Sequence, residues 1–152
     1  MSTRPDDFEH VDAFFAADHR ACDALWNAVE VAHEAGDDPA TLAAFKAFNA
    51  AMRRHLDMEE DILFPALGQA TGMGEAGPIA VMKHEHGQIR ALLDRMGNAA
   101  ACGDVDDVTD EGDTLLMLIA QHNVKEESIL YPMADRALGA EWAALRPKLA
   151  RY

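Results

Sequence analysis

Histidine and glutamate stand four residues apart at two places in the chain. His55 and Glu59 begin the segment HLDMEEDILFP, and His122 and Glu126 begin the segment HNVKEESILYP, so the pattern HxxxEExIL(F/Y)P occurs twice. Residues four apart on an α-helix lie on nearly the same face, about 6 Å apart along the axis. Each copy therefore offers one imidazole and one carboxylate to a common point, which predicts a metal site built between two helices.

The hydrophobic pattern places these side chains on buried helix faces. Apolar residues recur around each copy at alternating steps of three and four, which is typical of a helix face packed in a core. They are Phe45, Phe48, Met52, Ile62 and Ala66 around the first copy and Leu115, Ile119, Ile129 and Met133 around the second. Buried carboxylates and imidazoles need compensation by hydrogen bonds or by a cation. The alternative explanations for the repeated motif are a buried polar network without metal and a chance similarity left by duplication.

Two further segments each contribute one histidine to the same layer. Between residue 5 and about residue 33, His19 shares an apolar stripe with Phe15, Cys22 and Trp26. Between residue 78 and about residue 101, His86 lies on a stripe that carries the apolar residues Ile79, Met82, Ile89, Leu93 and Met96. His84 is two residues from His86 and so points to a different side of the helix. We therefore expect His86 in the site and His84 in solvent or behind a ligand.

Proline and glycine positions predict an all-α fold, an up-down-up-down four-helix bundle with a short C-terminal helix. We expect the first helix to begin near Pro5 and to close at Gly36. The second should be capped by Asp38 and end at Gly68, and the third should end at Gly103. The fourth should open in the acidic stretch 104–113 and run to about Pro132. The short last helix, about residues 141–149, should pack Trp142 and Leu145 on the outside of the bundle.

Length and composition are consistent with one domain over residues 1–152. A chain of 152 residues with 49% hydrophobic content can bury a substantial core. Cys22 and Cys102 lack the paired spacing of a zinc or redox motif, so we expect reduced thiols and a cytoplasmic location. A net charge of −14 argues against binding to nucleic acid or to anionic membrane surfaces. No segment has the pattern of a membrane span or a signal peptide.

These motifs resemble the hemerythrin-like, or HHE cation-binding, domain. The family pattern of single histidines and HxxxE motifs falls on His19, His55, Glu59, His86, His122 and Glu126. Within the family the chain is most similar to the di-iron domain of repair-of-iron-centres proteins, which share the HxxxEExILFP motif and a GPI-VM segment ending in EH, here residues 77–86. The resemblance implies a metal centre of two Fe ions joined by an oxo or hydroxo bridge, with Mn or Zn as substitutes.

Two positions differ from the oxygen-carrying hemerythrins. Those proteins have an extra histidine four residues after the third-helix ligand and an aspartate five residues after the fourth-helix histidine. Here the two positions hold Arg90 and Glu127. A five-histidine oxygen-carrier site is therefore not expected.

The resemblance implies a non-haem di-iron protein that binds or reduces small oxidants, namely O2, NO or peroxide. Its expected role is in oxidative or nitrosative stress response or in iron–sulfur repair, with an iron–sulfur protein client or an electron donor as partner. The alternative is an O2 or iron sensor or storage module without turnover. A third reading is a structural zinc or manganese bundle. Whether the chain is an enzyme, and its oligomeric state, are left open.

Several polar residues near the motifs have weaker assignments. Glu60 and Glu127 follow the ligand glutamates, and we expect them to be solvated or helix-flanking, with a hydrogen bond to a ligand imidazole as the alternative. Glu85 and Tyr131 are expected at the surface or in packing, with gating of the site as the alternative. His33 is expected to be structural, because it lies about 21 Å along the helix axis from His19.

Overall fold

The computed structural model describes residues 3–152, and every regular element in that range is helical. The long helices are α1 (Val11–Glu34), α2 (Asp38–Met58), α4 (Pro78–Ala101) and α5 (Val105–Lys125). The shorter elements are η1 (Pro5–Asp7), η2 (Glu59–Leu63), α3 (Phe64–Thr71), η3 (Glu126–Leu130), α6 (Tyr131–Leu138), η4 (Gly139–Glu141) and α7 (Trp142–Leu149). The predicted four-helix bundle with a short C-terminal helix is confirmed.

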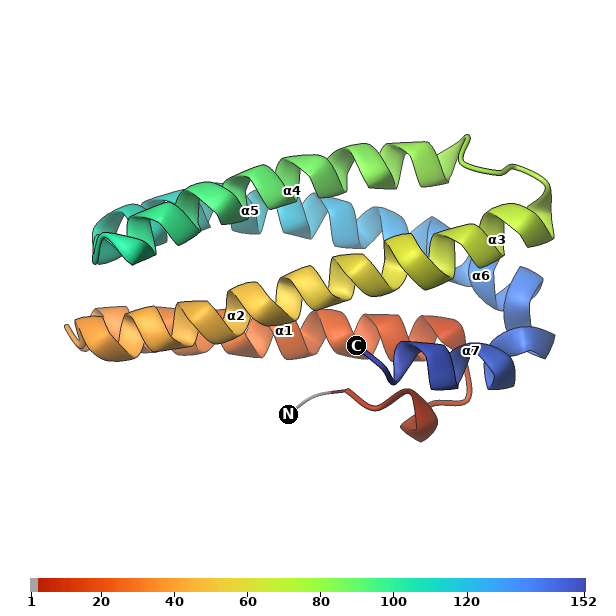
Figure 1. Ribbon diagram of the computed structural model, residues 1–152, viewed down its shortest axis with the longest axis horizontal. Helices are drawn as coiled ribbons and strands as arrows, with labels where there is room; N and C mark the ends of the chain where they lie inside the picture. The colour runs from red at the N-terminus through yellow and green to blue at the C-terminus, as the bar shows by residue number, and fades with distance from the viewer. Residues whose placement is uncertain (1–2) are drawn as a thin grey trace.

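Successive long helices reverse direction, so the bundle is up-down-up-down (Figure 1). Helices α1 and α2 form one pair, and α4 and α5 form the other. Each helix also contacts a member of the other pair, α1 against α5 and α2 against α4. Helix α7 lies outside the four long helices, near η1. None of the helices in residues 3–152 is long and apolar enough to cross a membrane.

Capping residues explain where the long helices begin and end. The Asp37 side chain accepts a hydrogen bond from the Ala40 backbone, so Asp37, and not Asp38 as predicted, caps α2. Asp104 caps α5 in the same way. Gly36 ends α1 in the left-handed conformation, with φ of 71°, as predicted. Pro5 does not begin α1, because the backbone is extended again at Phe8.

The helices that carry the HxxxE motifs continue past their prolines. Helix α2 passes through η2 into α3 and ends only at Thr71, and α5 passes through η3 into α6 and ends at Leu138. The predicted ends at Gly68 and about Pro132 are therefore wrong. Both η2 and η3 are single π-helical segments, each of which begins at the glutamate of its motif.

The prolines give a physical reason for the π-helical segments. Proline has no N–H, and its ring collides with the carbonyl four residues earlier in a regular α-helix. The chain accommodates Pro65 and Pro132 by widening the preceding turn, so that the Phe64 and Tyr131 N–H groups reach back to the carbonyls of Glu59 and Glu126. The helix axis continues, and the two glutamates sit at the widened turns.

The core forms two apolar clusters along the bundle. One lies at the end that carries α3, α6 and α7 and includes Phe14, Phe15, Phe64, Tyr131 and Trp142. The other fills the rest of the bundle and includes Trp26, Phe48, Ile89, Met96 and Leu115. As predicted, α7 packs against the bundle from outside, and its Trp142 and Leu145 are buried. The histidines and glutamates of the motifs lie between the two clusters along their helices.

Trp26 and Gly112 form the tightest contact between α1 and α5. The Trp26 ring is buried, and its Nε1 donates to Glu30, which restrains the ring. A Cβ added at Gly112 would lie 2.3 Å from two ring carbons of Trp26. Only glycine fits at this crossing without moving the indole.

The first prediction concerns this crossing. Gly112→Ala should lower the free energy of unfolding, because overpacking costs about 1–3 kcal/mol and exceeds the gain in helix propensity of about 0.5–1 kcal/mol. Gly97→Ala on α4 is the matched control, since its added Cβ meets nothing within 4 Å; it should stabilise the protein by about 0.5–1 kcal/mol. Denaturant unfolding of both variants measures the difference. Equal stabilisation by both would show that the Trp26 contact is not tight.

Candidate metal centre

Six buried polar side chains meet in the layer between the two apolar clusters. Each is at most 3% exposed. Their ligand atoms fall into two groups of four, within each of which all atoms lie within 4.8 Å of one another. The first group is His19, His55, Glu59 and Glu126, and the second is Glu59, His86, His122 and Glu126. The structure thus brings together all six residues predicted from the motifs, one or two from each long helix and its π-helical continuation.

Both glutamates belong to both groups, so their carboxylates span the space between two potential metal positions. Glu126 places Oε2 at 3.1 Å from His19 Nε2 and Oε1 at 2.9 Å from His122 Nε2. Glu59 places Oε2 at 3.5 Å from His55 Nε2 and 3.2 Å from His86 Nε2. Such an arrangement suits two cations bridged by carboxylates.

Unpartnered atoms in this layer supply a test of whether the residues fit a metal. Three buried side-chain atoms of the layer lack a hydrogen-bond partner within the described chain, namely His55 Nε2, Glu59 Oε2 and Glu126 Oε1. Unpartnered buried polar atoms are costly, and they are rare in folded proteins. All three are lone-pair donors of the kind that bind divalent transition metals. The donor set therefore fits a pair of cations.

A second layer of carboxylates orients the imidazoles. Every one of the four histidines has its Nδ1 within hydrogen-bond distance of a carboxylate oxygen, at 2.8 to 2.9 Å. The pairs are His19 with Glu127, His55 with Asp18, His86 with Glu60, and His122 with Glu85. A carboxylate only accepts, so Nδ1 carries the proton and the Nε2 lone pair is turned toward the centre.

Sequence reasoning found half of this outer layer. For Glu60 and Glu127 the alternative interpretation holds, because each accepts from an imidazole. Glu85 was expected at the surface or in packing, but it is nearly buried and holds His122. Asp18 was missed. A signal was present, since an acidic residue directly precedes the single histidine in both Asp18-His19 and Glu85-His86.

The whole constellation repeats within the chain. His19, His55 and Glu59 have counterparts 67 residues later in His86, His122 and Glu126. The outer carboxylates obey the same spacing, Asp18 with Glu85 and Glu60 with Glu127. The two halves of the bundle therefore contribute equivalent sets of side chains. Asp18 and Glu85 each bond the HxxxE histidine of their own half, whereas Glu60 and Glu127 each bond the single histidine of the other half.

Basic side chains anchor three of the four outer carboxylates. Arg54 pairs with Asp18, Lys125 with Glu85, and Arg90 with Glu60. Within residues 3–152, no lysine or arginine lies within ion-pair distance of Glu127. Inner and outer layers together hold six carboxylates against these three cations, so three negative charges remain to be balanced by protons on the imidazoles or by metal ions.

Tyr131 breaks the internal repeat at the centre. Its hydroxyl lies 2.6 Å from Glu59 Oε1, 2.9 Å from Glu126 Oε2 and 3.0 Å from His19 Nε2. Because the phenol has a single hydrogen, the two carboxylates share it. Tyr131 packs in the apolar core, as one of the expected alternatives had it, but the contacts of its hydroxyl with the inner glutamates were not expected. Its counterpart is Phe64, whose ring stacks on His86 with centroids 5.4 Å apart.

Electrostatics in the layer favour protons on the imidazoles when no metal competes. Burial lowers the pKa of His19, but hydrogen bonding and charge from Glu126 outweigh it and raise the pKa to about 9. Burial lowers the pKa of His86 as well, but the neighbouring carboxylates of Glu126, Glu59 and Glu60 outweigh it and raise the pKa to about 11. Despite desolvation, contacts with three histidines hold the pKa of Glu126 well below its usual value.

The remaining histidines lie away from the centre. His84 is exposed, in agreement with its predicted place off the buried face. His33 lies near the far end of α1, where Thr109 Oγ1 is 3.5 Å from its Nε2. Cys22 is buried in the core, as predicted for a small apolar side chain, and it forms no disulfide.

Comparisons with known proteins agree with the geometry. The hemerythrin HHE cation binding domain family matches residues 10–134. The iron-sulfur cluster repair proteins YtfE of Pectobacterium carotovorum and of Pectobacterium atrosepticum are each 44% identical to the chain over 57 residues. That segment is 37% of this chain and only 26% of each relative. No solved structure matches the chain.

The second prediction concerns the outer carboxylates. Asp18→Asn removes the charge that orients His55 and should weaken metal binding by about tenfold to a hundredfold, the usual effect of losing such a partner. Asp94→Asn is the control, because Asp94 forms an exposed ion pair with Arg53 far from the imidazoles. Competition with a chelator of known affinity measures both. Identical affinities in the two variants would rule out an orienting role for Asp18.

The third prediction concerns pH in protein stripped of metal by a chelator. The pKa values of His19 and His86 lie above the unfolded value of about 6.5. Their stabilising contribution is therefore full below pH 6.5 and is lost as pH rises through about 9 for His19 and about 11 for His86. Metal replaces these protons, so the gain in Tm on adding metal should grow with pH. A metal-free Tm that is constant from pH 6.5 upward would contradict this.

Proposed function

The chain belongs to the hemerythrin HHE cation-binding family, and on this basis we propose that it is a di-iron protein. His19 and His55 would hold one iron ion, His86 and His122 the other, and Glu59 and Glu126 would bridge them. The observation that supports this most is the sharing of both buried glutamates between the two groups of potential ligands. Manganese and zinc accept the same donors, but mixed imidazole and carboxylate ligation suits iron well.

Iron held by these residues would supply one-electron redox chemistry and could bind a small molecule. We propose that the small molecule is O2, NO or peroxide. The protein's own contribution is to keep the centre dry and its ligands fixed. Phe15 and Phe64 pack beside the imidazoles, with ring centroids 6.0 Å from His55 and 5.4 Å from His86. The Tyr131 hydroxyl donates to the bridging carboxylates and holds a proton beside the first position.

A role in iron–sulfur repair is the favoured physiological context within this proposal. It is supported by the similarity to the two YtfE proteins, whose names state that activity. An iron–sulfur protein would then be the client, and an electron donor would restore the reduced centre. Unpaired thiols at Cys22 and Cys102 agree with a reducing compartment, so we place the protein in the cytoplasm.

The fourth prediction tests the di-iron proposal. Protein loaded anaerobically with Fe²⁺ should bind two iron ions per chain and should give a stoichiometric spectral change with NO. Glu126→Ala should reduce binding to at most one iron ion, because both positions use this carboxylate. His86→Ala should also lose metal and lower Tm, since bound metal stabilises the folded state by mass action.

His84→Ala is the control for these variants, because His84 is exposed on the same helix as His86. It should bind two iron ions and react like the wild type. Metal analysis, magnetic measurements and NO titration distinguish the proposals. Two magnetically independent iron ions would exclude the bridged centre, and a loaded protein inert to both NO and O2 would favour storage.

A further inference from the structure

A cavity of about 470 Å³ opens between α1 and α5. It reaches the first metal position, the one held by His19 and His55, where His19 forms part of its wall. His19, Arg20 and Asp23 line it from α1, and Asn123 and Glu127 line it from α5 and η3. Glu127 is 43% exposed, whereas His19, to which it is bonded, is 3% exposed. The cavity therefore ends on His19, a ligand of the first position, and the group to which His19 belongs contains His55, whose buried Nε2 has no hydrogen-bond partner in the described chain.

The internal repeat predicts an equivalent opening between α2 and α4, but Arg90 spans that position. Arg90 Nη2 donates to Asp57 Oδ1 at 2.7 Å and lies 3.4 Å from Glu60 Oε2. Glu60 in turn holds His86, so the guanidinium clamps the outer carboxylate over the second metal position. The counterpart of Arg90 on α1 is Asp23, and the counterpart of Asp57 is Val124. Two differences between the halves, Arg90 against Asp23 and Asp57 against Val124, thus separate a clamped side from an open one.

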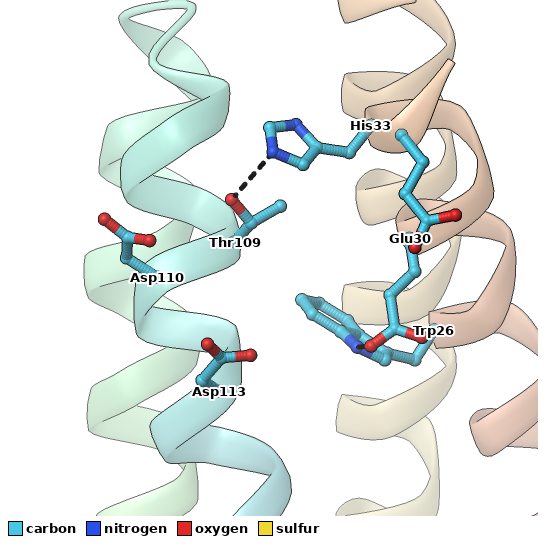
Figure 2. Close-up of a pocket in the computed structure, with 7 residues that line it drawn as sticks. Trp26, Glu30, His33, Thr109, Asp110 and Asp113 are labelled. Atoms are coloured by element: carbon cyan, nitrogen blue, oxygen red, sulfur yellow. Dashed lines mark hydrogen bonds between the residues drawn. The ribbon is translucent and has the colours of Figure 1, made fainter. Parts of the chain in front are cut away.

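Carboxylates continue along the α1–α5 interface away from the centre. A second cavity, of about 270 Å³, lies one helical turn farther from the metal layer, and Trp26, Glu30 and Glu34 line it from α1. Asp110 and Asp113 line it from α5 (Figure 2). The two cavities lie along one interface and are separated by the contact of Trp26 with Gly112; we call them together the α1–α5 groove. Arg20 is the one lysine or arginine among its described lining residues, which also include His19 and His33, against six carboxylates in all.

We infer that divalent metal ions enter and leave the centre through the α1–α5 groove, so that the position held by His19 and His55 exchanges faster than the clamped position held by His86 and His122. This inference rests on the proposed metal centre. A groove lined by one sign of charge concentrates ions of the opposite sign and speeds their association. Glu127 is the last carboxylate before His19, and no lysine or arginine in residues 3–152 pairs with it.

The test follows uptake of Co²⁺ by the full chain after removal of metal, because bound Co²⁺ absorbs visible light. Wild-type protein should load in two phases, and added salt should slow the fast phase. Asp23→Arg places a guanidinium where it can clamp Glu127 as Arg90 clamps Glu60. It should slow the fast phase by about tenfold or more while the final amount of bound metal is unchanged.

The reciprocal variant opens the clamped side. Arg90→Asp removes the clamp and places on α4 the residue that α1 carries at Asp23, and it should accelerate the slow phase while leaving the fast phase unaltered. Asp94→Arg is the charge-matched control for Asp23→Arg, since it adds the same charge at an exposed site outside the groove. It should load at the wild-type rates. Asp23→Asn, which removes the charge without adding bulk, should slow the fast phase to a smaller extent.

The outcomes separate the two proposals. Wild-type protein that binds fewer than two metal ions would overturn the di-metal centre and this inference with it. Protein that binds two ions, but in which Asp23→Arg and Arg90→Asp both load at wild-type rates, would overturn the groove alone. If Asp94→Arg slowed the fast phase as much as Asp23→Arg does, the groove would also be overturned, because the slowing would then come from the net charge of the protein.

Discussion

The structure depends on one layer of a helical bundle that holds six carboxylates and four imidazoles together, with all four imidazoles and four of the carboxylates buried. Such groups leave water only if each charge and lone pair finds a partner. Here the inner glutamates face the Nε2 atoms, the outer carboxylates hold the Nδ1 atoms, and three basic side chains anchor the outer layer from the surface. The apolar clusters on either side position the helices. Between them, the negative charge of the carboxylates requires positive charge nearby, and this requirement determines which residues can stand there.

The internal repeat explains how this layer is built, and its exceptions explain how the two positions differ. Side chains 67 residues apart perform equivalent tasks around the centre. Two pairs break the equivalence. Tyr131 adds a hydroxyl beside the first position where Phe64 offers only a ring, and Asp23 leaves open the side that Arg90 clamps. Both exceptions fall on the His19 and His55 side, which makes that position the more polar and the more accessible of the two.

The two π-helical segments connect local sequence to this geometry. In each copy the proline six residues after the glutamate forces a widened turn, and the glutamate sits at its start. π-Helical turns inside α-helices are frequent at functional sites. The prolines were visible in the motif, yet the second helix was predicted to end at Gly68, just beyond Pro65, and the fourth at about Pro132. Propensity alone cannot distinguish a stop from a bulge, because the burial of Leu67, Ala134 and Leu138 beyond the prolines decides that the helix continues.

The sequence alone determined the helical class, the antiparallel order of four long helices and the six inward-facing donors, because hydrophobic periodicity and four-residue spacing are local properties of a helix. It identified His86 over His84 for the same reason. The partners of the Nδ1 atoms were decided by tertiary structure. Asp18 reaches His55 and Glu85 reaches His122 only across helix interfaces, and no spacing along one helix encodes that contact. The place of Tyr131 and the clamp of Arg90 likewise depend on which helix faces which, and packing of the whole bundle sets that choice.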